Sequence, residues 1–208
     1  SRGEGSLALI NFVLSMEITT ELVKQLRDRT GISVMQCRKA LEEAEGDIEK
    51  AEVILRKRSA GAAEKKSDRE LGAGAIGNYL HGTEIGAMVL LSCETDFVAR
   101  NDEFPKLARE LAMQVAATNP QYLSDGDIDV EARAAAEAVF TAEVADKPAE
   151  MQEKILAGKM QSYFRDMVLL EQPFIKDESK TIRELIAEAS QKFGERVEIT
   201  KFVRFSAR

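Results

Sequence analysis

The hydrophobic pattern of this chain changes its period part-way along, and this change limits the folds that the chain can adopt. Before the change, apolar residues recur every three or four positions, as at Cys37, Ala40 and Leu41, which is typical of helices with one buried face. After it, the segments 75–80 and 84–93 are alternating or continuously apolar, as in strands. The sequence therefore predicts a helical part followed by a part that contains a β-sheet.

Capping signals divide the segment 16–58 into three short helices. The residues assigned to helix starts are Thr19 or Thr20, Ser33 and Asp47, and those assigned to helix ends are Gly31 and Gly46. Three helices of this length make a bundle of about 40 residues, near the lower size limit for independent folding. We expect an N-terminal three-helix domain over 16–58, followed over 59–73 by a linker of small and charged residues that is partly helical.

The remainder, residues 74–208, combines strands and helices. A hairpin is expected around the turn His81, Gly82 and Thr83, and a last strand is expected over 197–205. Between them the sequence predicts helices that begin at Asn101 or Asp102, near 129, at Pro148 and at Thr181. The predicted fold class is therefore α+β: a small three-helix module, then a core of helices packed on a small antiparallel sheet.

Residues 1–15 stand apart from this pattern. Within them, 7–14 are apolar but far shorter than the roughly 20 residues of a membrane span. No other segment approaches that length, so we expect no association with a membrane. A better folded pattern begins at Met16. We expect residues 1–15 to be an extension of unknown origin: an upstream extension, a processing remnant or a remnant of an expression vector.

The formal net charge of −7 argues against a general nucleic-acid-binding protein, which needs a basic surface to displace counterions. Basic residues do gather at 56–58 and 65–66, and we interpret them as a solvated helix end and linker. The two cysteines, Cys37 and Cys93, are far apart and are expected to be buried small hydrophobic residues. With the single His81 they do not make a zinc site, and two ordinary thiols favour a reducing intracellular compartment.

Two motif-like segments fail to support a nucleotide or metal site. The segment 72–77 fits the pattern GxGxxG, but a linker precedes it and a strand follows, whereas a dinucleotide-binding fold requires a strand before it and a helix after it. The segment 125–129 hints at a calcium loop, but Val130 and Ala136 occupy the positions of its Gly and Glu. We therefore expect no catalytic residues, no metal and no cofactor. An enzyme whose carboxylates meet only in the folded chain remains a weaker hypothesis.

A large aromatic ring lies beside a carboxylate at the corner between the second strand and the next helix. Corners of this kind are usually at the surface. Phe97 has two interpretations: it belongs to the local core, covered by Leu107 and Leu111, or it is held outward for insertion into another molecule. Asp96 likewise either helps to cap the helix that starts near Asn101 or accompanies the ring.

Motifs spread along the chain resemble the translation elongation factor Ts family. The matching residues are 26–31 (LRDRTG), Met35, Cys37, 39–41 (KAL) and 46–48 (GDI) in the helical part, 95–99 (TDFVA) at the corner, and 170–175 (LEQPFI) and 203–205 (VRF) in the later part. The resemblance covers about residues 16–208. Long members of the family carry two core subdomains. This chain is similar to short members with a single core, some of which are homodimers.

The resemblance implies guanine-nucleotide exchange on elongation factor Tu. It assigns Phe97 as a wedge near the magnesium and nucleotide site of the partner, with Asp96 as its polar companion and Thr95 and Val98 completing the loop. It also assigns partner-binding residues: Arg27 and Met35 at the partner's nucleotide domain, Ile32 and Val34 as added apolar area, and His81 facing another partner domain. Without the resemblance, Arg27 is interpreted as a solvated helix charge. Met35 is either a core residue of the bundle or lies nearer the turn, since Cys37, Ala40 and Leu41 already fill the inward face.

The alternative is a binding adaptor without exchange activity. Small three-helix modules of the ubiquitin-associated type bind ubiquitin or peptides through an apolar turn, which here spans residues 30–35. For the exchange factor, the expected partners are elongation factor Tu in its GDP-bound form and, in a homodimer, a second copy of the chain. The expected location is the bacterial cytoplasm, with an organellar matrix or plastid stroma as the alternative.

Overall fold

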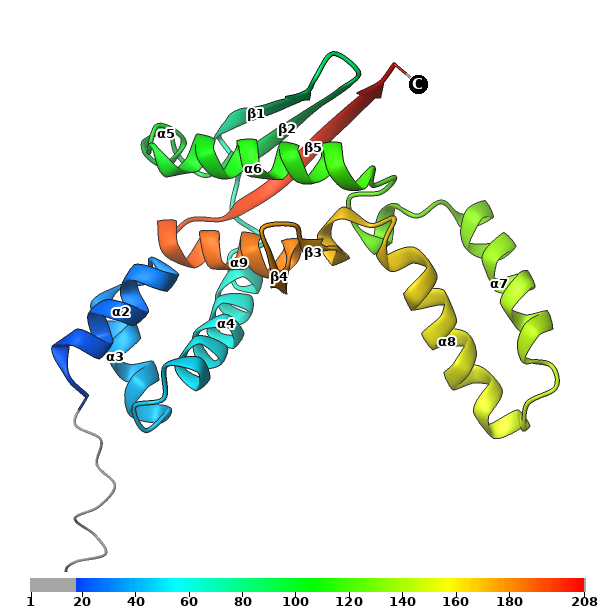
Figure 1. The fold of residues 1–208 in the computed structure, drawn as a ribbon, viewed down its shortest axis with the longest axis horizontal. Helices are drawn as coiled ribbons and strands as arrows, with labels where there is room; N and C mark the ends of the chain where they lie inside the picture. The colour runs from blue at the N-terminus through cyan, green and yellow to red at the C-terminus, as the bar shows by residue number, and fades with distance from the viewer. Residues whose placement is uncertain (1–17, 208) are drawn as a thin grey trace, which may run out of the picture. The chain divides into compact units, whose positions relative to one another are not determined.

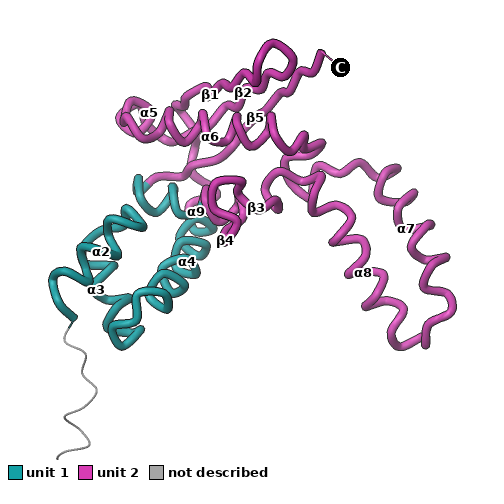
Figure 2. The backbone as a smooth tube through the Cα atoms, in the orientation of Figure 1, with its two compact units in different colours: residues 1–65, 187–194 teal, residues 66–186, 195–208 magenta. Residues whose placement is uncertain are grey.

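The computed structural model describes residues 18–207. They fall into two compact units (Figure 2). One contains the described residues up to 65 together with 187–194, and the other contains 66–186 and the residues from 195 onward. The extension expected over 1–15 lies outside the described residues. Within 18–207, no helix is both long and apolar enough to cross a membrane.

The first unit is a bundle of three consecutive helices to which the second half of a later helix is added (Figure 2). The helices are α2 (Thr20–Thr30), α3 (Val34–Glu43), α4 (Ile48–Glu64) and the second half of α9 (Ile182–Phe193). Its buried core consists of Val23, Leu26, Ile32, Cys37, Ala40, Leu41, Ala44, Ala51 and Leu55. The predicted helical face around Ala40 is thereby confirmed. The helix α4 continues to Glu64, six residues into the segment 59–73 for which a partly helical linker is expected.

The ends of these helices follow the predicted capping signals. The Thr19 hydroxyl accepts a hydrogen bond from the Leu22 N–H at 3.2 Å. The carboxylate of Asp47 accepts one from the Lys50 N–H at 3.0 Å. Gly31 follows α2 with φ of +67°, a conformation that glycine adopts without steric penalty. Local sequence therefore sets where α2 begins and ends and where α4 begins.

The second unit contains a three-stranded antiparallel sheet in the order β1-β2-β5. The strands are β1 (Ala73–His81), β2 (Ile85–Cys93) and β5 (Val197–Ser206). The helix α6 (Glu103–Thr118) lies along one face of this sheet (Figure 1). Gly77 on β1 allows this approach, because a Cβ atom there would collide with the backbone of Ala108 on α6. The predicted α+β class, with helices on a small antiparallel sheet, is confirmed.

Alternate strand residues form the core under α6. The buried residues of this layer are Ala87, Val89, Leu91 and Cys93 on β2, Phe104, Ala108, Leu111, Ala112 and Val115 on α6, and Val197 and Ile199 on β5. The opposite face of the sheet carries exposed apolar side chains: Ile76, Leu80, Met88, Leu90, Val203 and Phe205. Strand register places Leu80 and Phe205 on either side of Gly86.

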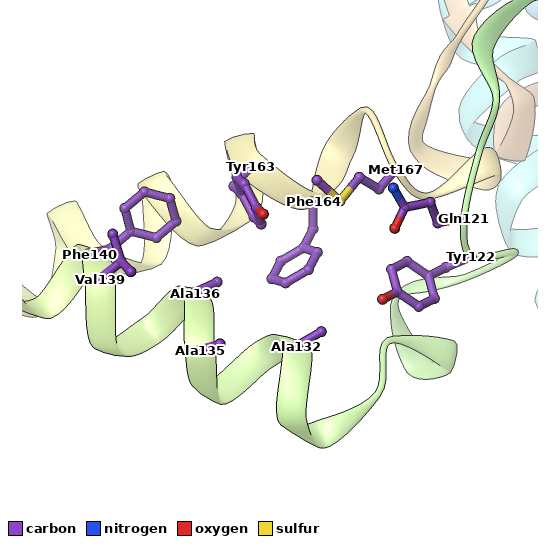
Figure 3. Close-up of a pocket in the computed structure, with 10 residues that line it drawn as sticks. All are labelled: Gln121, Tyr122, Ala132, Ala135, Ala136, Val139, Phe140, Tyr163, Phe164 and Met167. Carbon is purple, nitrogen blue, oxygen red and sulfur yellow. The ribbon is translucent and has the colours of Figure 1, made fainter.

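Two further features complete the second unit. The helices α7 (Val130–Val144) and α8 (Ala149–Arg165) lie side by side as a hairpin. Together with Gln121, Tyr122 and Met167 they line an open, mainly apolar pocket of about 510 Å³ (Figure 3). The strands β3 (Pro173–Phe174) and β4 (Asp177–Thr181) form a small second sheet that the sequence did not predict. The predicted helix start at Thr181 is confirmed by a capping box, in which the Thr181 N–H donates to Glu184 Oε2 at 2.8 Å and the Glu184 N–H donates to the Thr181 hydroxyl at 3.2 Å.

Candidate functional site

The corner after β2 turns one large ring outward. A single helical turn, α5 (Asp96–Ala99), follows Thr95 (Figure 1). Within this turn Val98 is 4% exposed whereas Phe97 is 86% exposed. Burial of Val98 fixes the inward side of the turn, so the adjacent Phe97 points to solvent. The interpretation in which Leu107 and Leu111 cover Phe97 is therefore wrong, and the outward interpretation matches the structure.

Asp96 lies beside the exposed ring. Its carboxylate is 3.5 Å from the Arg100 guanidinium, and both side chains are largely exposed. The start of α6 is capped differently, because Asn101 Oδ1 accepts a hydrogen bond from the Glu103 N–H at 3.0 Å. Asp96 is thus a solvent-facing charge next to Phe97 and does not cap α6.

A carboxylate from a distant part of the sequence holds this corner. Glu195 accepts hydrogen bonds from the Glu94 N–H at 3.1 Å, the Thr95 N–H at 3.0 Å and the Thr95 hydroxyl at 2.5 Å. The Cys93 thiol donates to the Thr95 carbonyl at 3.3 Å, and burial raises the pKa of this thiol. Both the N–H and the carbonyl of Thr95, which closely precedes Phe97, are therefore held by hydrogen bonds.

A second carboxylate, that of Glu94, links the end of β2 to residues near the start of β5 and before β1. It accepts from the Arg196 N–H at 2.5 Å and from the Arg69 guanidinium at 3.1 Å. The Arg196 N–H and then Arg69 lower the pKa of Glu94 below its ordinary value. Sequence reasoning missed Glu195 and Arg196, about a hundred positions after Glu94, and Arg69, 25 positions before it, because such distant partners leave no local pattern.

In the first unit, the predicted partner-binding residues differ in exposure. Met35 is 70% exposed and Val34 is 52% exposed at the start of α3, and Arg27 is exposed on α2. Met35 is therefore not a core residue of the bundle. Ile32 is only 2% exposed and belongs to the buried core. The expectation that Ile32 adds apolar area to the surface is wrong, because the turn between α2 and α3 points this side chain inward.

His81 is exposed at the last position of β1, where its Nδ1 lies 3.4 Å from the Tyr79 hydroxyl. The register pairs His81 with Ile85 at one end of the hairpin and Ala73 with Cys93 at the other. His81 is consequently separated from the Phe97 corner by the length of the hairpin, about 26 Å at the usual strand rise. The structure does not bring these two predicted residues together.

Among residues 18–207, no group of three or more His, Cys, Asp or Glu side chains is placed to hold a metal ion. The corner instead offers a rigid backbone, an exposed ring and an exposed carboxylate. Such a set can bind or displace groups of another protein.

The family model described as elongation factor TS matches residues 12–208. The chain belongs to the elongation factor Ts family. Elongation factor Ts of Thermodesulfovibrio yellowstonii is 47% identical over 191 residues, which cover 91% of this chain and 96% of that relative. Elongation factor Ts of Coprothermobacter proteolyticus is 44% identical over 194 residues, covering 92% and 98%, and that of Thermotoga neapolitana is 45% identical over 191 residues, covering 91% and 97%.

These matches confirm the resemblance to elongation factor Ts that the motifs indicate. They run through both the three-helix bundle and the core with its sheet. The alternative of an adaptor of the ubiquitin-associated type gains no support from them.

Proposed function

We propose that the chain promotes GDP release from elongation factor Tu by inserting Phe97 near the magnesium and nucleotide site of that protein. Membership of the elongation factor Ts family supports the exchange role. The observation that carries the mechanism is the 86% exposure of Phe97 on an anchored corner. Aromatic residues that become buried at the centre of an interface are typical binding anchors. Asp96 adds a carboxylate beside the ring.

Exchange of this kind is a coupling between two binding events and needs no bond chemistry. A nucleotide with nanomolar affinity is held by about 12 kcal/mol. The factor has to stabilise a partner conformation in which the magnesium contacts are broken, and each 1.4 kcal/mol of this coupling weakens nucleotide binding about tenfold. Because coupling is reciprocal, nucleotide with Mg²⁺ also weakens binding of the factor. The factor is thus released when exchange is complete.

A second contact is proposed for the first unit. Arg27, Val34 and Met35 are exposed there, and an apolar pair with a neighbouring cation suits a protein surface. We assign these three residues to the nucleotide domain of elongation factor Tu, and His81 to another domain of the same partner. The bacterial origin of the relatives supports the bacterial cytoplasm as the place where the chain acts on elongation factor Tu.

A second copy of the chain is the other proposed partner. Its support is the apolar outer face of the sheet, where Leu80 is 76% exposed and Phe205 is 68% exposed. Adjacent exposed apolar side chains on one face are typical of protein–protein contact sites. The proposed homodimer therefore uses this face.

The test is the rate at which labelled GDP leaves elongation factor Tu on addition of the chain. The wild-type chain should accelerate release strongly over the spontaneous rate. Phe97→Ala should keep the fold but reduce the exchange rate about thirtyfold or more, since an aromatic anchor contributes about 2 kcal/mol or more. Val130→Ala is a matched control, because Val130 is 82% exposed and lies on α7 outside the proposed contacts. Unchanged exchange by Phe97→Ala would rule out the wedge.

A further inference from the structure

The corner that carries Phe97 is short of local stabilisation. The helix α5 is a single turn of four residues, and Thr95, its N-cap, makes no side-chain hydrogen bond to the turn. Single helical turns are not stable by themselves, since nucleation fixes several dihedral angles for one hydrogen bond. The direction of the Phe97 ring must therefore be set by contacts from outside the turn.

Val98 packs the turn against the core, and Glu195 supplies three hydrogen bonds to the residues just before it. One of its carboxylate oxygens accepts from two consecutive backbone N–H groups, those of Glu94 and Thr95, and the other accepts from the Thr95 hydroxyl. The hydroxyl that would ordinarily cap α5 is thus engaged by Glu195. Hydrogen bonds to an ionised acceptor are about twice as strong as those between neutral groups.

Arg196, the next residue, forms hydrogen bonds with the same segment in the opposite sense, as a donor to Glu94. The Arg196 N–H donates to Glu94 Oε1, and the Arg196 guanidinium donates to the Arg69 carbonyl. Residues 94–95 and 195–196 therefore exchange hydrogen bonds both ways between the end of β2 and the start of β5. The two strands are neighbours in the sheet. Pairing within the sheet therefore keeps residues 94–95 and 195–196 opposite one another.

We propose that Glu195 is a positioning residue for nucleotide exchange: it holds the Thr95 junction so that Phe97 is presented outward in one fixed direction. This inference rests on the proposed role of Phe97. A corner that is ordered before binding loses less conformational entropy when the ring is buried in the partner. Glu195 itself needs no contact with elongation factor Tu.

The first measurement follows the ring without any partner. The chain contains no tryptophan, so Phe97→Trp introduces a single fluorescent reporter at the tip of the corner. In that background, Glu195→Ala should lower the fluorescence anisotropy of the tryptophan, while Thr95→Ser should preserve it and Thr95→Val should lower it in part. Glu178→Ala, which removes an exposed carboxylate on β4, is the control and should leave the anisotropy unchanged. Equal anisotropy in the Glu195→Ala and control proteins would overturn the proposal.

The second measurement tests whether Glu195 acts through Phe97. Glu195→Ala should reduce the maximal exchange rate about tenfold or more, the effect of losing hydrogen bonds to a charged group. The same substitution should add little further loss to a Phe97→Ala protein, because the ring that it positions is already absent. If Glu195→Ala instead reduces the exchange rate by the same factor in the Phe97→Ala protein as in wild type, Glu195 has a merely structural role and the proposal is overturned.

Two controls keep the outcome interpretable. Glu195→Gln retains one acceptor oxygen and should fall between wild type and Glu195→Ala in both anisotropy and rate, which provides the test if Glu195→Ala does not fold. Normal exchange by Phe97→Ala would reject the proposed wedge, whereas loss of exchange by Phe97→Ala with full activity of Glu195→Ala would reject only the positioning role.

Discussion

At the scale of single residues, neighbours in the same turn have opposite surroundings. Val98 is buried and Phe97 is exposed, although both are apolar and adjacent. The TDFVA motif indicates the corner, and composition alone does not say which of its apolar residues faces solvent. In the structure the buried Val98 fixes the inward side of the turn, and Glu94, Glu195 and Arg196 hold the residues just before it. These partners meet only in the folded chain, so this part of the site could not be predicted.

The charge on Glu94 gives a pH dependence to stability. The Arg196 N–H and Arg69 lower its folded-state pKa, so its stabilising contribution is present above the ordinary glutamate pKa of about 4.3 and is lost as pH falls through the lowered folded value. We expect the difference in free energy of unfolding between wild type and Glu94→Gln to shrink as pH is lowered from about 5. Urea titrations at a series of pH values measure it.

The cause of this pH dependence can be checked separately. Arg69 is one of the groups that lower the pKa of Glu94. The check compares the single variant Arg69→Gln with the double variant that carries both Arg69→Gln and Glu94→Gln. The difference in free energy of unfolding between these two proteins should change less with pH than the difference between wild type and Glu94→Gln. A wild-type difference that stays constant from about pH 5 downward would contradict the assignment.

At the scale of elements, the helices were largely predictable and the packing between distant elements was not. Thr19, Asp47 and Thr181 each cap a helix through atoms only three residues away, which is why their sequence signals are sufficient. The small sheet of β3 and β4 gave no such signal. Its two-residue strand β3 is too short for a periodic pattern, and it is joined to α6 by side chains remote in sequence.

Gln114 makes that connection between elements. It is fully buried on α6, where its Nε2 donates to Gln172 Oε1 and to the Pro173 carbonyl, each at 3.1 Å, and its Oε1 accepts from the Ile175 N–H at 2.9 Å. Gln114→Leu would remove these three hydrogen bonds and leave Gln172 Oε1 with only its bond from the Thr118 hydroxyl. Unfolding in urea should show a loss of about 1–3 kcal/mol.

A matched substitution separates the buried network from a general effect of glutamine loss. Gln161 is exposed on α8, and Gln161→Leu should change the free energy of unfolding by less than about 0.5 kcal/mol. Equal effects of the two substitutions would show that the network around Gln114 contributes nothing specific to the attachment of β3 to α6.

At the scale of the whole molecule, two of the surfaces proposed for partners are built from different parts of the same sheet. The Phe97 corner depends on the ends of β2 and β5, whereas the apolar outer face of the sheet is formed by their middle and far ends. Alternation of side chains along the strands, together with α6 on one face, leaves the other face uncovered within the second unit. Strand patterning predicted the sheet, but the sequence did not show that α6 covers only one of its two apolar faces.

The sheet face gives the prediction for assembly. Leu80 and Phe205 flank Gly86 in register on this face, and the Leu80 side chain lies 3.0 Å from where a Cβ atom at Gly86 would be. Sedimentation velocity should show that the wild-type chain dimerises with increasing concentration, because burying this face removes apolar area from water. Leu80→Glu and Phe205→Glu should each sediment as monomers, since they would place like charges in the interface. Val130→Glu, on an equally exposed position outside the sheet, should dimerise as wild type does. A wild-type chain that stays monomeric at every concentration would rule out this face as a homodimer contact.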